Sequence, residues 1–178
     1  MTDDKAYPDE PASPFPEPPT TIEDREGRPI TVRRYDETLD RDALEAMYDA
    51  FDPADRAQGI PPTGEKRIAD WLDTITGEET VNVVANHDDA VVGHATLVPD
   101  GEKTAELAIF VLQDYQGAGI GTGLLETLLG AGKEAGIERV WLTVERWNDP
   151  AISLYEKVGF VASDTESFEH EMTIRLQG

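Results

Sequence analysis

The 178-residue sequence contains no cysteine, few lysines and no long hydrophobic run. The absence of cysteine excludes disulfide bonds, thiolate metal ligands and a cysteine nucleophile. The three histidines (His87, His94 and His170) share no spacing typical of metal ligands, so we predict no metal site. No apolar stretch approaches the ~18 residues of a membrane span, and the N-terminus lacks the apolar core of a signal peptide. We therefore expect a soluble, cytoplasmic protein.

Positively charged residues are also few: the sequence has 15 Lys and Arg and 37 Asp and Glu, which gives a net charge of −22. A surface this negative repels phosphate backbones and anionic membranes, so we expect neither a nucleic acid nor a membrane as partner. Two explanations of the charge compete. One is a local acidic field that attracts a cationic partner, and the other is adaptation of the whole surface to high salt, which screens self-repulsion. Because the acids are spread from Asp3 to Glu171, we favour the second, halophilic, explanation.

The sequence divides into a tail and one domain. Residues 1–28 hold six of the twelve prolines and carry a net charge of −5. With few apolar residues, this segment cannot bury enough surface to offset its ordering entropy, so we predict a disordered or extended acidic tail. Residues 29–178 have a length that suits a single domain of ~100–200 residues.

Hydrophobic periodicity predicts the secondary structure of the domain. Strands are expected at 30–35, 80–87, 90–98, 104–112 and 139–145, with two short strands between 160 and 176. Helices are expected at 39–51, around 68–75, at 119–136 and after Pro150. The resulting order is β-α-α-β-β-β-α-β-α-β-β, and the short links between strands favour antiparallel neighbours. We predict an α/β (α+β) fold with a mixed, mostly antiparallel central sheet flanked by helices.

A glycine-rich turn between a predicted strand and a predicted helix is the most informative segment. Gly117, Gly119 and Gly121 allow the backbone to approach a ligand closely, and the free amides at a helix N-terminus favour an anion such as a pyrophosphate. The dinucleotide pattern G-x-G-x-x-G and the P-loop pattern are both absent here. The alternative is a glycine-rich helix start that only eases packing.

Two motifs together resemble the GNAT superfamily of acetyl-CoA-dependent N-acetyltransferases. The first is Gln116-Gly-Ala-Gly-Ile-Gly121, and the second runs from Asn148 through Tyr155 to Gly159-Phe160. The resemblance covers everything but the tail, and it implies a GNAT-like sheet that splays between the strands ending near Leu112 and Glu145. Within the superfamily, the region 34–56 has a weaker likeness to the protein lysine acetyltransferase branch.

The resemblance also implies how acetyl-CoA binds. The strand residues Ile109, Phe110 and Val111 should hydrogen-bond the pantetheine arm through their backbone. Asn148 should contact the coenzyme where the two strands splay apart. The pyrophosphate should be held by the loop and the helix start, which comprise Gln116, Gly117, Ala118, Gly119, Ile120, Gly121 and Thr122. The nearby cations are Arg146 and Lys157.

Tyr155 aligns with the family's tyrosine that donates a proton to the departing CoA thiolate. A phenol within reach of a thiolate can protonate it or donate a hydrogen bond to it. The alternative is a tyrosine of the hydrophobic core, because Ala151, Leu154 and Val158 lie on the same helical face as Tyr155.

The attacking amine must lose a proton, and Glu106 is the candidate general base, directly or through water. It interrupts an apolar strand just before the glycine loop, and some GNAT enzymes resemble this chain in carrying a Glu there. We expect partial burial to raise its pKa toward the useful range. The alternative is an acid that simply faces solvent. Glu145 is the second choice for the base and Glu79 the third.

The expected reaction is acetyl transfer from acetyl-CoA to a primary amine by direct attack. The acceptor, either a small amine or a protein lysine, stays open, as does the acyl group, for which succinyl is an alternative. The resemblance is also compatible with a homodimer. An alternative from another class is a non-catalytic acyl-CoA sensor, which keeps the glycine loop but needs neither Glu106 nor Tyr155.

Overall fold

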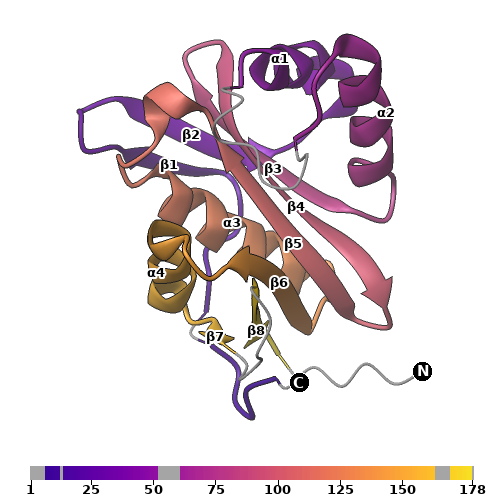
Figure 1. The fold of residues 1–178 in the computed structure, drawn as a ribbon, viewed down its shortest axis with the longest axis vertical. Helices are drawn as coiled ribbons and strands as arrows, with labels where there is room; N and C mark the ends of the chain where they lie inside the picture. The colour runs from indigo at the N-terminus through magenta and orange to yellow at the C-terminus, as the bar shows by residue number, and fades with distance from the viewer. Residues whose placement is uncertain (1–6, 13, 52–60, 163–168, 178) are drawn as a thin grey trace.

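The computed structural model describes residues 7–12, 14–51, 61–162 and 169–177, and these form one eight-stranded sheet with helices on both faces (Figure 1). The strand order is β1-β2-β3-β4-β5-β6-β8-β7. Within the described chain, β5 and β6 form the only parallel pair, which confirms the predicted mixed, mostly antiparallel sheet. The strands are β1 (Thr20–Glu23), β2 (Pro29–Arg34), β3 (Val81–His87), β4 (Ala90–Gly101), β5 (Thr104–Val111), β6 (Arg139–Glu145), β7 (Val161–Ala162) and β8 (Glu169–Arg175).

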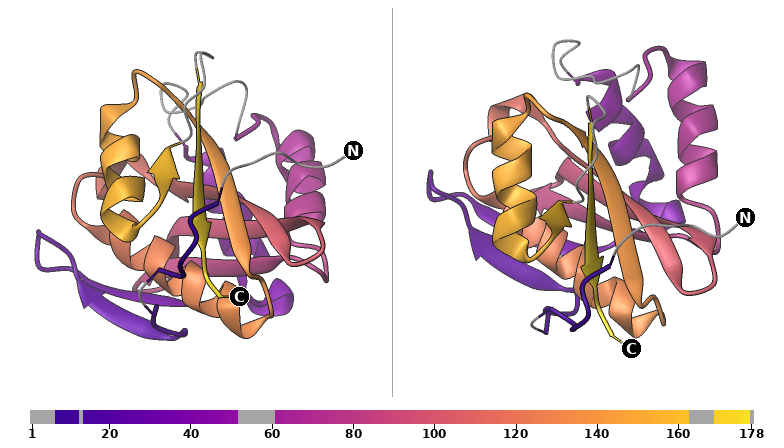
Figure 2. Two further views of the ribbon diagram at one scale, coloured as in Figure 1. Left: turned by 90° about the horizontal axis from the view of Figure 1, so that it is seen from below. Right: turned by 60° about the horizontal axis from the view of Figure 1, so that its bottom comes forward.

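In the described part of the chain, four α-helices cover the sheet, and their places follow from the alternation of side chains along the strands. The helices are α1 (Glu37–Asp49), α2 (Glu65–Ile75), α3 (Ile120–Glu134) and α4 (Asp149–Val158). On β3, Val83 and Ala85 join the core under α3 and α4, whereas Val84 joins a second core under α1 and α2. Figure 2 shows α4 and α2 on opposite sides of the molecule. The sheet is therefore buried on both faces at its centre.

Helix boundaries follow local capping chemistry. The carboxylate of Asp36 accepts hydrogen bonds from the backbone N–H groups of Thr38 and Leu39. This cap starts α1 at Glu37, two residues before the predicted start. Helix α4 begins after Asn148 with a proline in its first turn and ends at Gly159, where φ is 126°.

Part of the N-terminal segment, for which we predicted a disordered or extended tail outside the domain, belongs to the sheet. That prediction is wrong for residues 20–23, which form β1 at the edge of the sheet, with Thr20 opposite Val32 in the register. The Thr20 hydroxyl also lies 2.8 Å from that of Thr127 on α3. Further upstream, Ala12 donates a backbone hydrogen bond to Arg175 on β8. Residues 1–6 and 13 lie outside the described residues.

The sheet splays between β5 and β6, as predicted. These strands pair only from Thr104 to Glu106, where Glu106 lies opposite Trp141. Beyond that point β5 continues beside β4 as far as Val111, while β6 continues beside β8 as far as Glu145. Over the described strands, the β6-facing edge of β5 therefore has no strand partner after Glu106, and its backbone groups border the gap between the two strands.

Candidate active site

A cavity of about 590 Å³ lies at the fork between β5 and β6. It is bounded by both strands, the glycine loop and α4. Nine of the thirteen predicted site residues line it, namely Glu106, Ile109, Phe110, Val111, Gln116, Gly117, Gly121, Asn148 and Tyr155. The other four do not line it: Ala118 and Ile120 are buried in the core, and Gly119 and Thr122 lie in the loop and the first turn of α3.

The glycine loop has the conformation that the sequence suggests. Gly117 has φ 70° and Gly119 has φ 93°, a left-handed backbone that glycine adopts without a steric penalty. Gly119 is the N-cap of α3, and no side chain among the described residues caps this helix start. The first turn of α3 also carries no acidic residue, despite the charge of the chain. This end of α3 therefore presents free amides and the positive end of a helix dipole to an anion.

Gln116 and Asn148 both line the cavity and both take part in local structure. The Gln116 side-chain amide donates to the carbonyl of Val111 at 2.9 Å, which fastens the loop to the end of β5. The Asn148 Oδ1 accepts a longer hydrogen bond of 3.4 Å from the backbone of Ala151, as the N-cap of α4. Each residue thus has a structural task beside the predicted coenzyme contact.

Tyr155 on α4 is almost buried, with 9% of its surface exposed, and it lines the cavity. Its ring packs against Phe160, with 5.8 Å between the ring centroids. Burial raises the pKa of Tyr155 to about 12, so the phenol keeps its proton at neutral pH. Tyr155 is therefore part of the core and, at the same time, a protonated group at the cavity wall.

Glu106 lies at the start of the fork and lines the cavity, but it is exposed. The expected partial burial of this side chain is wrong, because the alternation of β5 buries its neighbours Ala105 and Leu107 and turns Glu106 to the other face.

Two further carboxylates line the cavity from the other arm of the fork. Glu145, the second choice for the base, is half-buried at the end of β6, directly opposite Glu169 on β8. Sequence reasoning missed Glu169, because its place depends on the register between two strands that are far apart in the sequence. Glu79 is exposed in the link between α2 and β3 and does not line this cavity.

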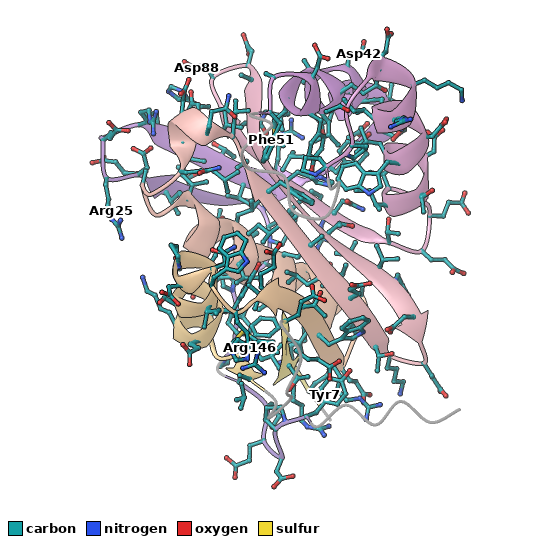
Figure 3. All side chains as sticks on the ribbon, in the orientation of Figure 1. Tyr7, Arg25, Asp42, Phe51, Asp88 and Arg146 are labelled. Carbon is teal, nitrogen blue, oxygen red and sulfur yellow. The ribbon has the colours of Figure 1, made fainter. Side chains whose placement is uncertain are left out.

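The sequence predicts Phe110 only as a backbone contact and does not predict the aromatic wall that its ring forms with Phe51. Both residues line the cavity with 6.2 Å between their ring centroids (Figure 3 labels Phe51). Tyr48 packs edge-on against Phe110 from behind, at 5.7 Å. The helical spacing of Phe51 indicated a core residue, and only the packing of α1 over β5 places it at the cavity.

Comparison with known proteins identifies the family. The family model described as "Acetyltransferase (GNAT) family" matches residues 44–160, and the chain belongs to this family. An uncharacterised N-acetyltransferase of Mycobacterium tuberculosis is 32% identical over 103 residues, which are 57% of this chain and 64% of that relative. The match thus spans somewhat less than two thirds of the relative's length.

Solved structures show the same fold. The GNAT domain of PAT from S. lividans superposes with a TM-score of 0.74 at 18% identity, covering 89% of this chain and 97% of that chain. A GNAT phosphinothricin acetyltransferase from Sinorhizobium meliloti, solved in complex with acetyl-CoA, has a TM-score of 0.67 at 22% identity, covering 83% of this chain and 89% of that chain.

Among the described residues, no helix is both long and apolar enough to cross a membrane. The same part of the chain contains no group of three or more His, Cys, Asp or Glu side chains that could hold a metal ion.

Proposed function

We propose that this protein transfers an acetyl group from acetyl-CoA to a primary amine. The observation that carries the proposal is the single cavity wall that joins the glycine loop at the start of α3 to Glu106 and Tyr155 at the fork of the sheet. Membership of the acetyltransferase family and the acetyl-CoA complex of the S. meliloti neighbour support the same donor.

The residues present fit the coenzyme. The left-handed Gly117 and Gly119 and the uncapped start of α3 would direct amides to the pyrophosphate. The edge of β5 after Glu106 faces the gap, so its backbone groups would pair with the amides of the pantetheine arm, in the manner of an added strand. The thioester would then lie between β5 and β6, near Tyr155 and Glu106.

The chemistry is a direct attack. The amine nitrogen bonds to the thioester carbonyl carbon, and the carbon–sulfur bond breaks. Tyr155, which keeps its proton at neutral pH, would give that proton to the departing thiolate. An alkylamine with a pKa of ~10.4 is mostly protonated at neutral pH, so it needs a proton acceptor. Glu106 would take this proton, through a water molecule if the amine nitrogen lies out of direct reach.

The part of the cavity where the amine acceptor would bind has side chains that favour a cation. The carboxylates of Glu106, Glu145 and Glu169 line the cavity and would attract an ammonium group, while Phe51 and Phe110 would pack against its carbon chain. A small amine and a protein lysine both have this chemistry, and the proposal leaves the acceptor open between them.

A turnover assay with Glu106→Gln tests the mechanism. The protein is incubated with acetyl-CoA and a panel of amines, and the free CoA thiol is measured. We expect Glu106→Gln to lower kcat well beyond tenfold, because general acid–base catalysis contributes ~10²–10⁴-fold. Tyr155→Phe should lower kcat by a similar factor. The dissociation constant for acetyl-CoA should stay nearly unchanged in both.

Glu79→Gln is the matched control, because it removes the same charge from an exposed acid outside the cavity. Unchanged kcat in Glu106→Gln would disprove the role as base. The exposure of Glu106 keeps the non-catalytic sensor as a second candidate function. Tight acetyl-CoA binding by the wild type without turnover on any amine would favour that sensor.

A further inference from the structure

The turn between β1 and β2, residues 24–28, lies against the glycine loop. Figure 3 shows Arg25 at the tip of this hairpin, beside the loop that leads into α3. The backbone N–H of Arg25 donates to the carbonyl of Ala118 at 2.9 Å, and its guanidinium donates to the carbonyl of Gly117 at 2.9 Å. Two segments about ninety residues apart in the sequence are thus joined at the predicted pyrophosphate site.

The same turn makes a second set of contacts through Arg28. Its guanidinium carbon lies 4.1 Å from the centroid of the Tyr115 ring, a cation–π distance. Its Nη1 donates to the carbonyl of Asp114 at 3.3 Å. These contacts hold the short 3-10 turn (Gln113–Tyr115) that precedes the glycine loop.

Asp24 makes the hairpin turn rigid. The side chain is fully buried, and its carboxylate accepts hydrogen bonds from the backbone N–H groups of Glu26 and Arg28, at 3.0 and 2.8 Å. It also accepts a bond of 2.7 Å from Nε of Arg28. A turn that is fixed in this way can fix the loop it touches.

The carbonyl contacts determine where the loop amides point. In a planar trans peptide, the C=O and the following N–H point in opposite directions. Because the carbonyls of Gly117 and Ala118 are held toward the hairpin, the N–H groups of Ala118 and Gly119 are turned away from it. The Arg25 charge at the oxygen end of one peptide also polarises that peptide and strengthens its N–H as a donor.

We propose that the β1–β2 turn is part of the coenzyme site, with Arg25 as a positioning residue that orients and polarises the loop amides for the pyrophosphate. The inference rests on the proposed function. In this proposal the cations that act near the loop are Arg25 and Arg28 of the N-terminal segment. From the sequence alone, the nearby cations are instead expected to be Arg146 and Lys157.

Donor analogues test this assignment. Arg25→Ala and Arg25→Lys are compared with wild type on three donors. These are acetyl-CoA, acetyl-dephospho-CoA, which lacks only the 3′-phosphate, and S-acetyl-pantetheine, which lacks the pyrophosphate and the adenosine as well. We expect Arg25→Ala to raise KM for the first two donors about fivefold with kcat unchanged, as the loss of one exposed charge-assisted hydrogen bond would. KM for S-acetyl-pantetheine should stay the same, and Arg25→Lys should recover most of the loss.

Arg34→Ala is the matched control. It removes the same charge from an exposed arginine, whose partner Glu134 lies at the far end of α3. The fifteen residues of that helix separate the two ends by ~21 Å. This variant should keep the wild-type KM on every donor.

The outcomes separate the two proposals. Equal KM for Arg25→Ala and wild type on acetyl-CoA would overturn the role of Arg25 while the proposed function stands. A similar loss on S-acetyl-pantetheine would also overturn it, since that loss would be a general structural defect. A loss confined to acetyl-CoA would place the effect at the 3′-phosphate and overturn the pyrophosphate assignment. A wild type that neither binds acetyl-CoA nor turns it over would overturn the proposed function, and this inference with it.

Discussion

A buried histidine should make the stability of this protein fall in mild acid. His94 on β4 is fully buried, with Nδ1 2.7 Å from the Tyr48 hydroxyl and Nε2 2.7 Å from Oδ1 of Asn82. The Asn82 amide donates its own protons to Ile75 and Thr80, so Oδ1 is the acceptor and Nε2 of His94 carries the proton. Nδ1 then accepts from Tyr48, and the imidazole is neutral with both nitrogens satisfied.

The magnitude follows from the pKa of His94, which burial lowers to about 3 from an ordinary value near 6.5. Between these values the unfolded chain binds a proton that the folded protein does not bind, so stability is present above pH 6.5 and is lost as the pH falls toward 3. From pH 7 to pH 5 the loss is about 2 kcal/mol. For a protein of this size that corresponds to a melting temperature lower by about 4–8 °C.

Urea denaturation at pH 7, 6 and 5 measures this loss. In His94→Gln, which can still accept from Tyr48 and donate to Asn82, the free energy of unfolding should fall by about 2 kcal/mol less over this interval than in wild type. Tyr48→Phe keeps the buried imidazole and should therefore keep the wild-type pH dependence, although its stability is lower throughout. Equal pH dependence of His94→Gln and wild type would refute the reasoning.

Two further predictions concern packing and charge. An added Cβ on Gly130 of α3 would overlap the backbone carbonyl of Pro16, so Gly130→Ala should lower the free energy of unfolding by about 1–3 kcal/mol. At Gly77 the nearest atom is 3.7 Å from such a Cβ, so Gly77→Ala should change the free energy of unfolding much less. Equal effects of the two substitutions would contradict the packing of Pro16 on α3. If the charge of −22 reflects adaptation to salt, molar KCl should raise the melting temperature by screening self-repulsion, and a flat or falling curve would refute that explanation.

The parts of the fold that local signals specify could be predicted from the sequence. Strand β6 has the predicted bounds, because Arg139–Glu145 is a compact apolar run. The strand, glycine turn and helix around residues 106–122 follow in the predicted order. Strand β1 was missed because four residues among prolines and acids give no periodic signal. It is held by distant partners, as the Thr20–Thr127 hydroxyl contact shows.

The candidate site divides in the same way. The glycine loop is a local feature, and its place between a strand and a helix could be predicted from the sequence. The proposed acceptor side is assembled from elements that meet only in the fold: Phe51 follows the C-cap of α1, and Glu169 is placed by its register with Glu145 on β6. A sequence pattern contains no information on that register. The exposure of Glu106 could not be predicted for a related reason: Phe110, on the same face of β5, packs under α1 and α2, whereas Glu106 lies exposed on that face.

The net charge and the proposed ligand pose a physical conflict, because a chain of −22 repels the phosphates of acetyl-CoA at long range. The local arrangement reduces this conflict without a lysine in the loop. The first turn of α3 is free of acids, and the positive end of the helix dipole lies there. From the hairpin, Arg25 contacts the loop and Arg28 contacts the 3-10 turn that precedes it. Long-range repulsion between exposed charges is screened within ~8–10 Å at moderate salt, whereas a hydrogen bond through one peptide acts over only a few ångströms. Salt therefore weakens the repulsion by the whole surface far more than the attraction by the loop, and a site built from backbone amides suits an acidic protein better than one built from surface cations.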